Sequence, residues 1–113
     1  MGGYLMQIIK WFQEASWEQK ILLDSSLYIM QASWNIRDES WNVSLYTNEN
    51  IPLFEGKKVN INVDLLAQVT STNKPTGLLL VVPIAKEKGV EVITRDNMGS
   101  EVELVYISRN EIF

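Results

Sequence analysis

The sequence predicts an all-β fold, a small single-domain antiparallel barrel or sandwich of about seven or eight strands. Most of the chain alternates between apolar and polar residues, which is the period of a half-buried strand. Clusters of Gly, Pro, Asn, Asp and Ser interrupt these stretches at roughly 8–12-residue intervals, as turns do. A length of 113 residues with 46% hydrophobic residues fits one domain with one core.

Seven stretches are predicted to be strands. They cover residues 16–23, 27–34, 41–47, 53–63, 78–85, 90–94 and 101–108. Turns are expected between them, among them the segments DSS at 24–26, NENIP at 48–52 and KEKG at 86–89. In the fourth stretch, Val59, Ile61 and Val63 are expected to share one face. The fifth, LLLVVPIA, does not alternate, so we expect a strand buried on both faces.

The first residues fit two structures. Leu5, Ile8, Ile9 and Phe12 are spaced like one face of a helix, but no good N-cap residue precedes them. The same stretch is also compatible with an extended segment on the edge of the domain. We therefore expect an N-terminal arm or extended segment over 1–13 and a β-domain over 14–113.

One short helical turn is also expected. Asp64 is a suitable N-cap for a turn that covers Leu65, Leu66, Ala67 and Gln68.

The residues that support catalysis are scarce. The chain has no Cys and no His, so the commonest metal ligands and the commonest general base are missing. Ser25 and Ser26 have no base to activate them. Asp38 and Glu39 form the one acidic pair beside an aromatic strand, but a turn would leave both carboxylates solvated. We expect no catalytic, metal or cofactor site; a hydrolase would require two carboxylates that converge in a cleft.

Charge and hydropathy argue against two classes of partner. The net charge is −4, and acidic and basic residues are mixed along the chain without a basic block, so nucleic-acid binding is not expected. The longest apolar run is far too short to span a bilayer, so no membrane segment is expected.

Two tryptophans flank the expected turn at residues 35–40. Trp34 and Trp41, with Arg37 between them, could form an aromatic platform for a carbohydrate or another ligand. The same pair could instead cover the core and fix the register of two strands. Cross-strand aromatic pairs are common in sheets, so the second interpretation is favoured, and a small ligand-binding module remains the alternative function.

A further pattern extends through five parts of the chain. These are WNVSLY at 41–46, Gly56, DLLAQ at 64–68, GLLLVV at 77–82 and TRDNMGSEVELVYIS at 94–108. Together they resemble the baseplate plug family of contractile-tailed bacteriophages, of the cyanophage type. The likeness covers nearly the whole chain after Met6 and is most specific at residues 94–106.

The resemblance implies a structural protein of the virion rather than an enzyme. It implies a position in the tail baseplate near the central hub and spike, with the hub, spike and tail-tube proteins as partners. A symmetric multimer within the virion and synthesis in the host cytoplasm are expected.

Residues near the chain ends and at two corners are expected to contact such partners. Apolar residues at chain ends are commonly buried by a neighbour when they are ordered. The expected interface residues are Tyr4, Leu5, Ile8, Ile9, Trp11, Phe12, Trp34, Arg37, Arg95, Asp96, Ile112 and Phe113.

The corner at residues 94–101 has specific expectations. Gly99 should supply a positive φ, Asn97 a left-handed conformation, and the carboxylate of Asp96 should accept backbone N–H groups. After this corner, Val102, Leu104 and Tyr106 should form the inward row of the last strand.

Overall fold

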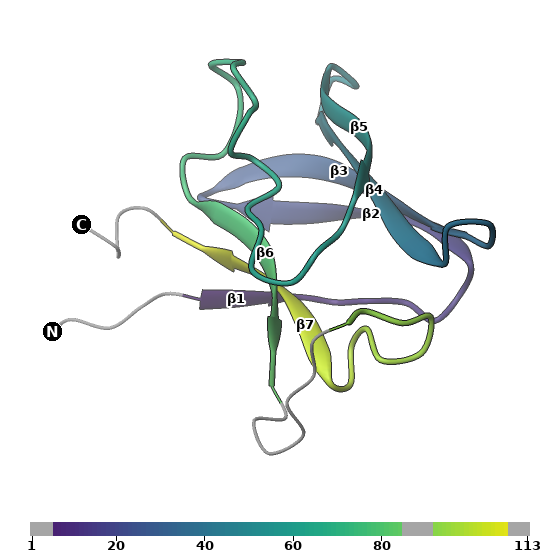
Figure 1. The fold of residues 1–113 in the computed structure, drawn as a ribbon. Coiled ribbons are helices and arrows are strands. Elements are labelled where there is room, and N and C mark those ends of the chain that lie inside the picture. Colours follow the sequence, from purple (N-terminus) through teal and green to yellow (C-terminus); the bar gives the residue numbers. More distant parts are fainter. Residues whose placement is uncertain (1–5, 85–91, 109–113) are drawn as a thin grey trace, which may run out of the picture.

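The computed structural model describes residues 6–84 and 92–108, which form seven strands in two antiparallel sheets (Figure 1). The strands are β1 Met6–Ile9, β2 Ser16–Leu23, β3 Ser26–Asn35, β4 Ser40–Thr47, β5 Pro52–Lys58, β6 Leu78–Pro83 and β7 Val102–Ile107. The all-β class predicted from the alternating stretches is confirmed, and the arrangement is a sandwich.

The larger sheet follows the chain order. β2, β3, β4 and β5 are neighbours in sequence and in space. The hairpin between β2 and β3 turns on Asp24 and Ser25, which both have positive φ. Two left-handed residues form the tight turn that matches the twist of a hairpin. The turn expected at residues 24–26 is therefore confirmed.

The smaller sheet joins the two ends of the described chain. Its order is β1–β7–β6, and β7 pairs with both neighbours. Met6 lies opposite Ile107, and Leu78 lies opposite the same residue from the other side. β1 therefore begins, and β7 ends, at the same end of this sheet (Figure 1).

One hydrophobic core fills the space between the sheets. The alternating rows of β2, β3 and β4 point into it, with Leu23, Met30 and Leu45 fully buried. The smaller sheet contributes Leu79, Val81, Val102, Leu104 and Tyr106, so the predicted inward row of the last strand is confirmed. Side chains from both sheets form one cluster, which makes the sandwich a single packed unit.

The N-terminal stretch is extended rather than helical within the described residues. β1 pairs residue by residue with β7, and Ile9 and Trp11 are buried in the core. The residues after Met6 are thus part of the sandwich.

The expected helical turn at residues 64–68 is a pair of turns and not a helix. Asp64 holds this segment through its side chain, because its carboxylate oxygen Oδ1 accepts the N–H groups of Leu66 (3.0 Å) and Leu79 (2.9 Å). The second of these bonds ties the turn to β6.

Two strand expectations are wrong in part. β5 ends at Lys58, and Val63 is exposed while Val59 is buried, because Ile61 leaves the larger sheet to form a bridge with Val81. The stretch LLLVVPIA is buried on one face only, with Leu79 and Val81 inside. The expected hairpin turn at 86–89 lies outside the described residues, and residues 92–94 are not a strand.

Candidate interaction surface

Four tryptophans form an aromatic cluster where the N-terminal segment crosses the larger sheet. Trp11 meets Trp17 at 4.9 Å and Trp41 at 5.0 Å between ring centroids, both nearly perpendicular. Trp34 meets Trp41 at 5.4 Å. The indole N–H groups of Trp11, Trp17 and Trp41 are buried without an oxygen acceptor. The nearly perpendicular arrangement of the rings is a favoured geometry for aromatic pairs.

This cluster does not form an open platform. Trp41 is 0% exposed, and Trp34 packs half-buried at the margin of the core. The two residues pair across β3 and β4, as the favoured interpretation predicted. A sugar cannot stack on a fully buried ring, so the alternative carbohydrate site at Trp34, Arg37 and Trp41 lacks its central element.

Arg95 belongs to the same cluster. Its guanidinium lies 5.0 Å from the centroid of the Trp41 ring, and Nη2 donates a hydrogen bond to the carbonyl of Gln13. The side chain of Gln13 in turn donates to the carbonyl of Met98 at 3.1 Å. These contacts join the corner at 94–101 to the segment that follows β1, and the partners of Arg95 in them belong to its own chain.

Asn97 organises this corner. Its Oδ1 accepts the N–H of Thr94 at 2.8 Å, and its own N–H donates to Thr94 Oγ1 at 3.1 Å. Its carbonyl accepts N–H groups from Ser100, Glu101 and Val102. Two expectations for this corner were wrong. Asn97 does not have a positive φ. The side-chain acceptor of the turn is Asn97 and not Asp96.

Gly99 has φ of +85°, as the sequence predicted. Gly99→Val should lower the free energy of unfolding by about 2 kcal/mol, since a β-branched residue resists this conformation. An added Cβ would be only 3.4 Å from Trp11 Cβ, an ordinary contact, so the backbone conformation accounts for most of the cost. Urea denaturation checks this, with Gly99→Asn as the control because Asn tolerates positive φ. Equal losses for the two variants would contradict the explanation.

A second polar network links the two sheets at the opposite end. The hydroxyl of Tyr106 accepts the N–H of Gly77 at 2.8 Å and donates to the carboxylate of Asp24. The other oxygen of that carboxylate accepts from Ser108 at 3.0 Å. Burial, followed by the hydrogen bond to Asp24, raises the pKa of Tyr106 well above its ordinary value. The network thus fixes the β2–β3 hairpin to the ends of β6 and β7.

Tyr106→Phe should lower the free energy of unfolding by about 1–3 kcal/mol, because the N–H of Gly77 loses its acceptor inside the protein. Stability should also change with pH. The neutral phenol is favoured in the folded state, so its contribution is complete below a pH of about 10 and decreases as the pH rises further. Urea denaturation between pH 8 and 11 measures both effects.

Tyr46→Phe is the matched control, because the Tyr46 hydroxyl bonds to Glu55 on the exposed surface. It should cost far less stability than Tyr106→Phe at neutral pH.

The wild-type protein and Tyr106→Phe should converge in their free energies of unfolding as the pH rises above 10. A constant difference across that range would show that Tyr106 does not titrate differently in the folded state.

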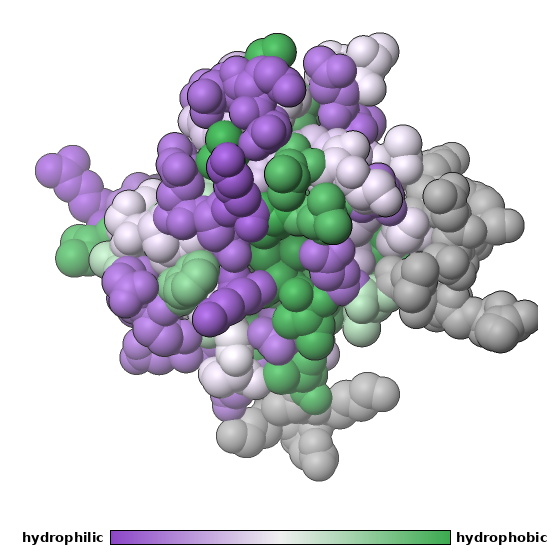
Figure 2. Space-filling model, turned by 180° about the vertical axis from the view of Figure 1, so that it is seen from behind, coloured by the Kyte–Doolittle hydropathy of each residue, from purple (hydrophilic) through white to green (hydrophobic). Residues whose placement is uncertain are grey.

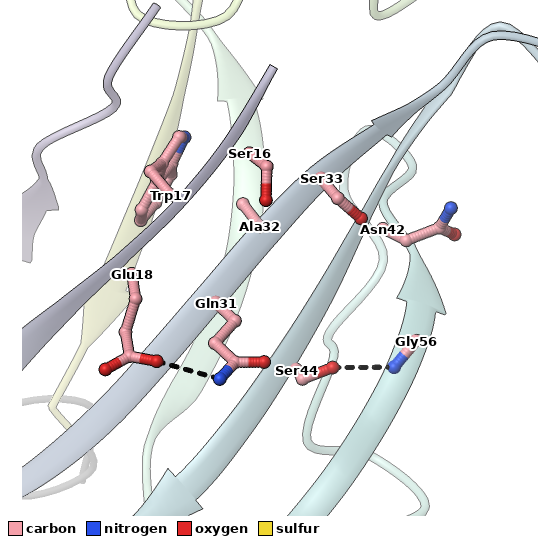
Figure 3. Close-up of a pocket in the computed structure, with 9 residues that line it drawn as sticks. All are labelled: Ser16, Trp17, Glu18, Gln31, Ala32, Ser33, Asn42, Ser44 and Gly56. Carbon is pink, nitrogen blue, oxygen red and sulfur yellow. Dashed lines mark hydrogen bonds between the residues drawn. The ribbon is translucent and has the colours of Figure 1, made fainter. Parts of the chain in front are cut away.

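The outer face of the larger sheet carries a shallow polar groove of about 430 Å³ (Figure 3). Across its floor, Gln31 donates to Glu18 at 2.8 Å, and the N–H of Gly56 donates to Ser44 at 2.9 Å. Glu18 is the one carboxylate among the residues that line it. The groove therefore holds no pair of acids for acid–base catalysis.

The acidic pair does not converge elsewhere. Asp38 and Glu39 are both exposed in the turn between β3 and β4, where Asn35 Oδ1 accepts the N–H groups of Arg37 and Asp38. Glu39 lines a separate small pocket that Asp38 does not reach. Within 6–84 and 92–108, no three His, Cys, Asp or Glu side chains are grouped to bind a metal ion. The described chain also contains no helix capable of crossing a membrane.

The outer face of the smaller sheet is apolar over two rows, and Glu103, opposite Val82, adds a carboxylate in the row beyond them. Paired residues on neighbouring strands point to the same side, so Met6, Ile107 and Leu78 form one row and Ile8, Val105 and Leu80 the next. Met6 and Ile8 are 52% and 56% exposed. Figure 2, seen from behind the view of Figure 1, shows apolar side chains gathered in a band on that side of the molecule. Val105, in the middle of this face, is 1% exposed, and Leu80 and Ile107 are half-buried, so the exposed apolar side chains of these two rows are Met6, Ile8 and Leu78.

A family model described as the cyanophage baseplate plug, Pam3 gp18, matches residues 6–109. The chain belongs to this family of baseplate plugs. The resemblance predicted from the sequence is therefore confirmed, together with a structural role in a phage tail baseplate. No match is found among curated proteins.

The plug chain presents its predicted interface residues unequally. Ile9 and Trp11 are covered by the chain's own core, so no neighbour is needed to bury them. Ile8, Arg37 and Asp96 are exposed, and Phe12, Trp34 and Arg95 are half-buried. Tyr4, Leu5, Ile112 and Phe113 lie outside the described residues. Their contacts with other baseplate proteins stay a prediction.

The sequence analysis did not identify the apolar outer face of this plug chain as a surface, although the sequence contains a pattern that indicates it. The unbroken run at 78–85 indicates a strand that is apolar on both sides, and the prediction took both sides to be buried. No local sequence pattern indicates the network around Asp24 and Tyr106, because 82 positions separate the two residues.

Proposed function

We propose that the chain is a plug that fills space in the baseplate beside the central hub and spike, by contacts with the hub, spike and tail-tube proteins. It is synthesised in the host cytoplasm and enters the virion as part of a symmetric assembly. The observation that carries this proposal is the family match, which covers residues 6–109.

The structure supports such a role in two ways. A plug must hold its shape under load, and both ends of this sandwich are fastened by side-chain networks around Asn97 and Tyr106. A plug must also bind neighbours permanently, and permanent interfaces are more apolar than transient ones. The outer face of β1, β7 and β6 has that character.

The test is genetic removal of the chain from the phage that encodes it. Particles that lack the chain should have baseplates that fail to assemble or that are unstable, and expression of the wild-type chain in the host should restore them. Electron microscopy and plaque counts provide the measurements. Normal, infective particles without the chain would contradict a structural role.

A further inference from the structure

The four sheet edges of the sandwich differ in how they are protected against strand addition. An exposed edge strand normally carries charges, proline, bulges or a covering segment, because its free backbone groups can pair with another chain. The edge strand β2 has Glu18 and Lys20. The opposite edge, β5, has Pro52, irregular pairing with β4, and the adjacent Lys57 and Lys58.

The edge of β6 is covered by the chain itself. The segment around residues 61–65 runs beside it, where Asn62 donates to the carbonyl of Val81 and Leu65 to that of Leu79, both at 2.8 Å. The fourth edge, β1, is short, with four residues, but has none of these other devices. Its sequence is MQII, without charge, proline or glycine, and among the described strands it pairs with β7 alone.

The unprotected edge adjoins the apolar face. Met6 and Ile8 point outward from β1 and continue the rows formed by Ile107 with Leu78 and by Val105 with Leu80. An added strand would gain backbone hydrogen bonds along β1 and would place every second side chain beside these rows.

We propose that β1 is a docking edge to which an extended segment of another baseplate protein adds as a fourth strand of the smaller sheet. This proposal rests on the function proposed above and names the surface that performs it. The segment carries apolar residues at alternate positions, toward the outer face, and an acidic residue near Lys10.

Charge supports the last feature. Lys10 follows β1 directly, is exposed, and lies 5.0 Å from the centroid of the Phe12 ring. Since the chain as a whole is acidic, at −4, a cation at this edge distinguishes the site from its surroundings.

Symmetry disfavours a second copy in this place. Two identical β1 edges that pair antiparallel are related by a two-fold axis. The two ends of a phage tail differ, and copies arranged around its axis are related by rotation about that axis, which leaves no two-fold across it. A different baseplate chain meets the edge without this restriction.

The test uses the phage with substitutions in this chain. Ile8→Lys places a charge on the edge strand in the way natural edges are protected. Ile36→Lys is the matched control, because Ile36 is the same residue type, 79% exposed, in the turn between β3 and β4. Ile8→Lys should reduce the amount of the chain in purified particles about ten-fold or more, which corresponds to about 1.4 kcal/mol of binding free energy. Ile36→Lys should leave it unchanged, by quantitative mass spectrometry.

Two measurements on the wild-type chain keep the test independent of folding. Amide hydrogen exchange at Met6–Ile9 should be slower in the particle than in the free chain. A photoreactive methionine at position 6 should cross-link to a different baseplate protein, at a segment with alternating apolar residues.

Three results would overturn the proposal. They are incorporation of Ile8→Lys at the control level, unchanged exchange at β1, or a cross-link to a second copy of this chain. In each of these cases the wild-type chain is still present in the baseplate, so the proposed function stands. Absence of the wild-type chain from the particle is the separate result that refutes the function itself.

Discussion

Trp41→Ala is expected to lower the free energy of unfolding by about 3–5 kcal/mol, the usual range for removing a large aromatic side chain from a core. Trp41 is 0% exposed and contacts the rings of Trp11 and Trp34. The guanidinium of Arg95 also lies over it. The substitution therefore empties the site where the segment after β1 and the corner at 94–101 both meet the larger sheet.

Urea denaturation followed by far-ultraviolet circular dichroism measures this loss. Trp34→Ala is the control, since Trp34 is half-buried at the edge of the same cluster and should cost clearly less. Limited proteolysis should also become faster near residues 10–13 in Trp41→Ala. A loss of less than 1.5 kcal/mol would show that the cluster contributes little to the stability of the fold.

Gly77→Ala is expected to cost about 3 kcal/mol, at the upper end for the insertion of one methyl group into a packed site. A Cβ at this position would lie 2.1 Å from the backbone oxygen of Ile107 and 2.8 Å from the Tyr106 hydroxyl. The first of these neighbours belongs to the paired strand β7 and cannot move alone. The start of β6 must therefore separate from β7, or the hydrogen bond from Gly77 to Tyr106 must break.

Gly56→Ala is the matched control for that substitution. Gly56 has φ of +62°, but no atom lies within 4 Å of an added Cβ. Its cost is the left-handed conformation alone, about 1–2 kcal/mol. The control should therefore be less destabilised in the same denaturation experiment. The steric explanation fails if Gly77→Ala is as stable as Gly56→Ala.

The sequence predicted the larger sheet well because one face of it is buried. β3 and β4 have core residues such as Met30 and Leu45 at every second position, and this period is sufficient to set both the strands and the inward face. The tight turn at Asp24 and Ser25 follows from turn chemistry. These features depend on local order in the chain.

The features that the sequence did not predict depend on tertiary pairing. Leu5, Ile8, Ile9 and Phe12 are spaced as on a helix, yet Met6–Ile9 pairs with β7, almost 100 positions away. Whether Arg95 binds a partner or its own chain depends on the position of Gln13, which no local pattern fixes. The same holds for the outer face of β6, whose apolar composition was recognised but whose partial exposure was not.

The central claim is that this chain is a structural part of the baseplate, and a cryo-electron microscopy reconstruction of the intact phage tests it most directly. We expect density for the two-sheet sandwich in the baseplate, close to the hub and spike, at fixed occupancy in every particle. A complete baseplate reconstruction with no density for this sandwich, from infective particles, would contradict the claim.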